Sequence, residues 1–102
     1  MLSSLLKAVD DEDPKVRIEA IYTFGAIAPS PIAGEYVEAL VRALDHYDPA
    51  IRAAAASVAG RLEAKAAGEA LIKAVNDSQE PVRFAAMRAL GDIREESAVQ
   101  AL

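Results

Sequence analysis

The sequence predicts an all-α protein, a right-handed α-solenoid of about three helix pairs plus the start of a further helix. The 102 residues include 23 alanines but only 5 aromatic residues, a composition that suits closely packed helices better than strands. Apolar residues recur at helical spacing. The chain also repeats itself with a period of 31 to 35 residues, which is typical of solenoids. We expect residues 1–102 to form a single domain.

The repeat becomes visible when three segments of the chain are aligned. They begin at Leu6 (LKAVDDEDPKVRIEAIYTFGAIA), Val41 (VRALDHYDPAIRAAAASVAGRLE) and Ile72 (IKAVNDSQEPVRFAAMRALGDIR). In each segment an arginine is followed by an alanine and then by a glycine at the same spacing. The first copy carries about four extra residues, which we expect in a loop over 29–34. The predicted boundaries of the repeats are about 2–28, 31–63 and 64–94, with a final helix over 95–102.

Each copy has the pattern of two helices separated by an acidic turn. The first helix of the first copy is indicated by apolar residues at helical spacing, namely Leu2, Leu5, Leu6 and Val9. The second helix is expected to start where an aspartate precedes a proline, at Asp13 in the first copy and Asp48 in the second. This is the arrangement of an N-cap followed by proline at the first helical position.

The second helix of each copy carries an apolar stripe that we expect to bury against the first helix. The stripe consists of Val16, Ala20, Thr23, Phe24 and Ile27 in the first copy, and of Val82, Ala86, Ala89, Leu90 and Ile93 in the third. One helix pair of this size cannot bury both of its apolar faces, so the copies are expected to stack side by side around a continuous core. Small residues at Ala55, Ala56 and Ala59 would let neighbouring helices approach closely.

The three segments DEDPKVR, HYDPAIR and SQEPVRF, each followed by an alanine and a glycine, carry a family resemblance. On these motifs the chain resembles HEAT-like repeats, and within them the phycobilisome-lyase-type subtype. The resemblance covers about residues 2–102. It is specific for the fold and weak for the function, because HEAT-like units occur in scaffolds, adaptors, bilin lyase subunits and larger enzymes.

The resemblance also implies a ladder of ion pairs between repeats. In such repeats the acidic residue six positions before the arginine joins that arginine, which maps onto Asp11 with Arg17 and onto Asp77 with Arg83. In the middle copy His46 occupies the acidic position in front of Arg52. We therefore expect one rung to be weaker there, or to be rebuilt through a neighbouring aspartate, either Asp45 or Asp48.

The charge of the chain argues against several classes of partner. With 11 basic and 16 acidic residues the net charge is −5, the wrong sign for general attraction to nucleic acid or to an anionic membrane surface. No apolar run approaches the length of a membrane span, and the first 13 residues contain neither a basic leader nor a cleavage site. The absence of cysteine excludes disulfides and thiolate chemistry. We expect a cytoplasmic protein that binds neither nucleic acid nor membrane.

The residues that catalysis would need are scarce. His46 is the single histidine and is followed by Tyr47, so the His-Glu pairs that bind metal in HEAT-repeat di-iron hydroxylases are absent. The acidic run over 10–13 lacks the glycine and the twelfth-position glutamate of a calcium loop, and we interpret it as a helix end plus a cap. No glycine-rich phosphate loop is present. We therefore predict no catalytic, cofactor or metal site, and a protein that is not an enzyme.

A binding surface is the remaining prediction. Helical geometry places one set of residues opposite the buried side of the second helices, on the side that is concave in a HEAT-like solenoid. This set is Ile18, Tyr22, Ala53, Ser57, Phe84 and Arg88. Exposed aromatic and arginine side chains are common anchors of protein interfaces. The alternative is that Ile18 and Phe84 pack on neighbouring helices, while Tyr22 and Arg88 are ordinary solvated side chains.

Three functions remain open at this point. The leading hypothesis is a non-catalytic scaffold or adaptor that binds a protein or peptide on its concave face. The second is a subunit resembling phycobilin lyases, which would hold a bilin or a phycobiliprotein, with Arg88 and Tyr22 at the propionates and the ring. The third is a structural segment of a larger HEAT-repeat protein, with self-association through the exposed ends of the solenoid.

Overall fold

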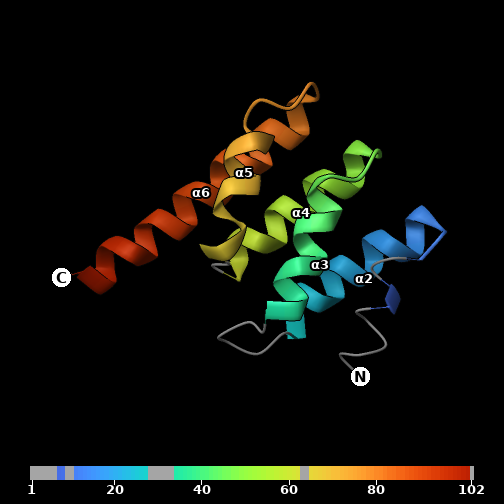
Figure 1. Cartoon of the computed structure of the whole chain (residues 1–102), viewed down its shortest axis with the longest axis horizontal. Helices are drawn as coiled ribbons and strands as arrows, with labels where there is room; N and C mark the ends of the chain where they lie inside the picture. The colour runs from blue at the N-terminus through green and yellow to red at the C-terminus, as the bar shows by residue number, and fades with distance from the viewer. Residues whose placement is uncertain (1–6, 9–10, 28–33, 63–64, 102) are drawn as a thin grey trace.

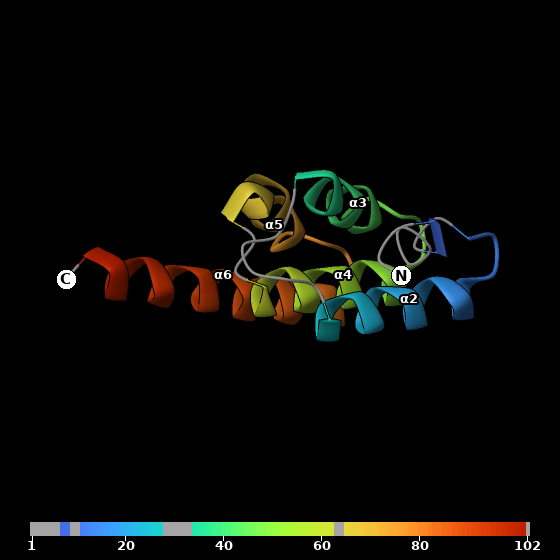
Figure 2. The same cartoon turned by 90° about the horizontal axis from the view of Figure 1, so that it is seen from below.

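The protein folds into two layers of helices, as Figures 1 and 2 show for a computed structural model. The structure describes residues 7–8, 11–27, 34–62 and 65–101, and it describes the side chains of these residues except for 27, 65 and 95–101. The predicted all-α class is confirmed, since every regular element in the described part of the chain is a helix. The whole chain measures 43 × 32 × 17 Å along its principal axes.

One layer consists of three longer helices and the other of shorter ones. The first layer contains α2 (Pro14–Ile27), α4 (Pro49–Arg61) and α6 (Glu80–Ala101), which lie side by side with α4 in the middle. The second layer contains α3 (Gly34–Leu44), the 3-10 turn η1 (Lys65–Ala67) and α5 (Gly68–Ala74). This is the layered arrangement of an α-solenoid.

The long helices begin at equivalent positions because the same turn precedes each of them. Asp48 is the N-cap of α4, and its Oδ1 accepts the backbone N–H of Ala50 at 2.9 Å, with proline at the first helical position. Asp13 accepts the N–H of Lys15 at 2.9 Å in the same way before α2. A short polar side chain that satisfies a free N–H at a helix start is the usual way to fix where a helix begins.

The core lies between the layers and between the long helices. In α4 the side chains of Ala55, Ala56 and Ala59 are fully buried, as expected from their size. The closest approach is between α4 and α6, where a Cβ on Gly60 would lie 2.6 Å from the Cα of Ala89. Only glycine fits at that contact without moving one of the two helices.

The apolar stripe expected on α2 is partly wrong. Ala20 and Phe24 are buried, but Val16 is 37% exposed and Thr23 is exposed, whereas Ile21, which lay outside the expected stripe, is fully buried. The reason is that α2 packs on α4 along one side, and in the described part of the chain no helix of the same layer covers its other side. The prediction had buried the whole stripe against the first helix of the same copy.

In α6 four of the five stripe positions, Val82, Ala86, Ala89 and Ile93, are buried, and Leu90 is half-buried. The helix then continues without interruption to Ala101, where a separate helix over 95–102 had been expected. Neither glycine nor proline occurs after Gly91, so nothing local ends the helix.

The expected Leu2, Leu5, Leu6 and Val9 positions and the loop over 29–33 lie outside the described residues. No helix in the described ranges, α6 included, has the length and apolarity needed to cross a membrane.

Candidate protein-binding surface

The layer formed by α2, α4 and α6 has one face turned away from α3 and α5 (Figure 2), which we call the inner face. Its residues follow from the helical period, because they lie opposite the buried alanines Ala20, Ala55 and Ala86. The set is Lys15, Ile18, Tyr22 and Ala26 from α2, Ala50, Ala53, Ser57 and Arg61 from α4, and Pro81, Phe84, Arg88 and Asp92 from α6. All six residues predicted for a binding surface belong to it.

Bulky side chains project from the two outer helices of the inner face. Tyr22 on α2 is 46% exposed and Phe84 on α6 is 59% exposed, and Arg88 one turn after Phe84 is exposed as well. Between them α4 contributes the small side chains of Ala53 and Ser57, which are half-buried. The inner face therefore carries bulky side chains on its two outer helices and small ones in the middle.

The burial of Ile18 and Phe84 bears on the two interpretations left open by the sequence. Ile18 is half-buried, as expected for a side chain that packs partly on a neighbouring helix. Phe84 presents more than half of its surface, so it does not serve as a core residue of this chain. An exposed aromatic beside an exposed arginine is the composition found at the energetic centres of protein interfaces.

The inner face is also more basic than the rest of the molecule, which sequence reasoning missed. It carries three cations, Lys15, Arg61 and Arg88, and one anion, Asp92, so its net charge is +2 while that of the whole chain is −5. The signal was available, because Lys15 precedes Ile18 by three positions and Arg61 follows Ser57 by four, which places them on the same helical face.

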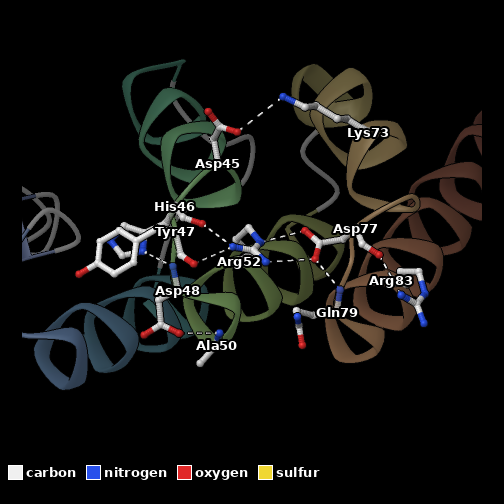
Figure 3. Close-up of polar contacts among 10 residues, drawn as sticks. All are labelled: Asp45, His46, Tyr47, Asp48, Ala50, Arg52, Lys73, Asp77, Gln79 and Arg83. Atoms are coloured by element: carbon white, nitrogen blue, oxygen red, sulfur yellow. Dashed lines mark hydrogen bonds and ion pairs between the residues drawn. The ribbon is translucent and has the colours of Figure 1, made fainter.

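The turns between the layers carry a second polar cluster, built around Arg52 (Figure 3). Its Nε donates to Oδ2 of Asp77 at 2.8 Å and its Nη2 donates to Oδ1 at 3.1 Å. Its Nη1 donates to the backbone carbonyls of His46 at 2.8 Å and Tyr47 at 2.9 Å. Both partners of this bidentate ion pair are largely buried, and the hydrogen bonds from Arg52 hold the pKa of Asp77 below its ordinary value of 3.8.

The expected pairing of the ladder is therefore wrong by one repeat. Asp77 pairs with Arg52 of the preceding repeat, and Arg83 donates to the backbone carbonyl of Asp77 at 2.9 Å instead of to its carboxylate. Asp77 thus faces backwards along the solenoid, toward the preceding repeat. A rung joins residues 25 positions apart, which a spacing of six within one copy could not indicate.

His46 stands where a carboxylate was expected, and the arginine that lacks an ion pair as a result is Arg17. Arg52 keeps its ion pair with Asp77. Among the described residues, Nε and Nη1 of Arg17 are buried and donate to no acceptor, so the expected pair with Asp11 is not formed. The Nδ1 of His46 accepts the N–H of Asp48 at 3.0 Å, which requires an unprotonated nitrogen. Burial lowers the pKa of His46, and the charges of Arg17 and Arg52 lower it further, against the opposing effect of Asp48. The half-buried imidazole replaces the carboxylate that Arg17 needs.

A hollow of about 730 Å³ lies beside this cluster, between the ends of α3 and α5. Two of its cations are paired within the chain, since Arg52 pairs with Asp77 and Lys73 lies 3.6 Å from Asp45 across the solvent-exposed rim. No part of the sequence argument had pointed to this hollow. Its lining is Val41, Arg42, Leu44, Asp45, His46, Tyr47, Arg52, Ala70, Lys73, Ala74, Asn76 and Asp77. Within the described part of the chain, no group of three or more potential metal ligands comes together.

Comparison with known proteins agrees with the repeat pattern and the layered fold. A family model that describes HEAT repeats matches residues 2–71 and, in a second overlapping match, residues 37–102. Each match spans more than half of the chain, and together they cover residues 2–102. A search of curated proteins found no match. The repeated helix pairs, the arginine ladder and the two matches together place this chain in the HEAT-repeat family.

Proposed function

We propose that this protein is a non-catalytic binding module that holds an extended peptide segment of a partner protein on its inner face. The observation that carries the proposal is the exposure of Tyr22, Phe84 and Arg88 on the two outer helices of that face. HEAT repeats commonly mediate protein–protein interaction, and proteins built from them are generally non-enzymatic scaffolds. The proposed function is therefore the family's usual one, assigned to a particular surface.

The composition of the inner face specifies the kind of peptide. Tyr22 and Phe84 suit apolar or aromatic side chains, because burying an aromatic ring at an interface is strongly favourable. Arg61 and Arg88 suit carboxylates, to which the planar guanidinium donates two parallel hydrogen bonds. The small Ala53 leaves room for a peptide backbone between them. We expect a ligand that combines acidic and apolar residues.

Selection from a library of random peptides displayed on phage tests the proposal. The wild-type chain is the bait, and peptides are counter-selected against the variant Tyr22→Ala, Phe84→Ala, Arg88→Ala. We expect enriched peptides that carry Asp or Glu next to apolar residues and that bind the triple variant at least about tenfold more weakly, which is a difference of about 1.4 kcal/mol.

A matched control separates this surface from the rest of the molecule. The variant Tyr47→Ala, Lys73→Ala also removes an aromatic ring and a cation, but from the exposed surface around the turns, where Tyr47 is 81% exposed. It should bind the selected peptides like the wild type. Equal binding by wild-type chain and triple variant, at matched thermal stability, would refute the proposal and would favour a structural segment of a larger HEAT-repeat protein.

The basic charge of the inner face supports a second candidate, a role resembling that of phycobilin lyases. A bilin carries two propionates and an extended conjugated ring system, which would suit Arg88 and Tyr22 on this face. Titration with biliverdin distinguishes the two candidates, because binding in a fixed geometry changes the absorption spectrum of the pigment. A spectral change that the triple variant lacks would support this role, and an unchanged spectrum would exclude it.

A further inference from the structure

We propose that separate copies of this chain stack head to tail, with the α6 edge of one copy bound to the α2 edge of the next. The α6 edge comprises Ile72, Arg83, Met87 and Gly91, and the α2 edge comprises Asp11, Val16 and Thr23. The two edges lie on opposite sides of the long-helix layer (Figure 1). The proposal is independent of peptide binding, because neither edge includes a residue of the inner face.

The contact between α4 and α6 shows how one repeat of this chain meets the next. Gly60 of α4 lies against Ala89 of α6 so closely that a Cβ would be 2.6 Å from its Cα. Ala56, one turn earlier on α4, is fully buried on the same side. Arg52 completes the contact through its ion pair with Asp77. A close glycine contact, a buried side chain and an arginine–aspartate rung therefore define the interface between repeats.

The α6 edge repeats the α4 half of this interface with nothing bound to it. Gly91 is equivalent to Gly60, and a Cβ on it would meet nothing within 4 Å. Met87 is equivalent to the buried Ala56 but is 46% exposed. Ile72 on α5 is 60% exposed, whereas its equivalent Val41 is half-buried and lines the hollow between α3 and α5.

Arg83 is oriented for an ion pair between repeats in the same way as Arg52. Its Nη1 donates to the backbone carbonyl of Asp77, just as Nη1 of Arg52 donates to that of His46. In the described part of the chain no carboxylate accepts from its other N–H groups. The backbone contact fixes the orientation of the guanidinium. Its remaining N–H groups are therefore available to a carboxylate from outside the described repeats.

The α2 edge presents the complementary half. Asp11 is exposed, and its Oδ1 accepts the N–H of Asp13 at 2.9 Å, the same bond to the second residue along that Asp77 makes with Gln79. This hydrogen bond orients the carboxylate of Asp11 in the same way as that of Asp77, which binds Arg52. Val16 and Thr23 are exposed, whereas the equivalent residues of α4 and α6 are at most 1% exposed because a neighbouring helix covers them.

The two edges match in charge and in register. Placing the α2 edge of a second copy against α6 pairs Asp11 with Arg83 and brings Thr23 against Gly91, as Ala89 lies against Gly60. Such a contact uses two different surfaces, so it does not close on itself as a two-fold dimer does and can add further copies. The stack would continue the solenoid and keep the inner face of every copy on the same side.

Sedimentation velocity over a wide range of protein concentration tests this inference. We expect the average mass of the wild-type chain to rise with concentration beyond that of a dimer. Gly91→Gln should remain folded, because the new side chain enters open space, but it should weaken association by at least about tenfold because it keeps the helices apart. A monomer at every concentration, or unchanged association of Gly91→Gln, would overturn the inference.

Charge reversal provides an independent arm of the test. Arg83→Asp and Asp11→Arg each place like charges at the contact, so each variant alone should stay monomeric. An equimolar mixture restores the wild-type pair between Arg83 of one variant and Asp11 of the other, and it should associate again. Failure of the mixture to associate would contradict the assigned residues. Tyr22→Ala, on the inner face, is the control and should associate like the wild type.

Discussion

Replacing His46 by aspartate should stabilise the protein, because it supplies the acceptor that Arg17 lacks. Two buried donors of Arg17 have no partner among the described residues, and position 46 is equivalent to Asp77, which binds Arg52. The turn itself should tolerate the change. Asp11 and Asp77 each accept the N–H of the second residue along, as Nδ1 of His46 accepts that of Asp48.

The size of the gain follows from the bonds made and lost. Arg52 donates to Asp77 through Nε and Nη2, so by analogy the new carboxylate would accept from Nε of Arg17, which now has no acceptor. A charge-assisted hydrogen bond of this kind contributes about 1.5–3 kcal/mol when buried and less where solvent reaches the pair. The substitution removes the stacking of His46 on Tyr47, whose ring centroids lie 4.3 Å apart, at a cost of about 0.5–1 kcal/mol. We expect a net gain of about 1–2 kcal/mol, with Tm rising by about 4–8 °C for each kcal/mol.

Urea unfolding of a double-mutant cycle measures this gain and attributes it. The cycle compares wild type, His46→Asp, Arg17→Ala and the double variant, and the coupling energy should account for most of the stabilisation. His46→Asn is the control, since it keeps the bond to the Asp48 N–H but provides no charge. If His46→Asp stabilises the Arg17→Ala background as much as the wild type, the assignment of the missing rung to Arg17 is refuted.

Three further predictions concern stability. Arg52→Ala should lower the free energy of unfolding by about 3 kcal/mol, measured in urea, because it leaves the largely buried Asp77 carboxylate without its cation; a loss below about 1 kcal/mol would contradict the importance of the rung. Because the pKa of His46 is lowered on folding, the unfolded chain binds more protons, so stability should fall as the pH drops from the ordinary value of 6.5 to the folded pKa. The lowered pKa of Asp77 should cause a second loss of stability below pH 3.8. His46→Ala should abolish only the first loss. Gly60→Ala should destabilise the fold by about 1–3 kcal/mol through its contact with α6, while Gly91→Ala, in open space, should stabilise it by about 0.5–1 kcal/mol, and thermal melts of both at low concentration should show opposite shifts.

The starts of α2 and α4 were predictable because their determinants are local. Asp48 followed by proline fixes the start of α4 through a bond that spans two residues, and no distant contact is needed. The exposure of Tyr22 and Phe84 was also predictable, since the helical period places them opposite the buried residues Ala20 and Ala86. Local rules and one burial assumption were enough for both.

What the sequence did not show depends on neighbours. Asp77 lies six positions from Arg83 and 25 from Arg52, and only the direction in which the repeats stack decides between them. The exposure of Val16 likewise depends on which side of α2 is covered, since its equivalents Ile51 and Val82 are fully buried. In a repeat protein equivalent sequence positions differ in environment, because each repeat contacts only its immediate neighbours.

The missing carboxylate at position 46 has a consequence for how the molecule moves. In a chain of repeats, cooperativity passes from unit to unit through the interfaces, and an interface without its ion pair transmits it less. We therefore expect the junction of α2 with α4 to deform more easily than the junction of α4 with α6, which has its ion pair. Tyr22 lies on α2 and Phe84 on α6, so we expect the distance between them to adjust to the ligand that the inner face binds.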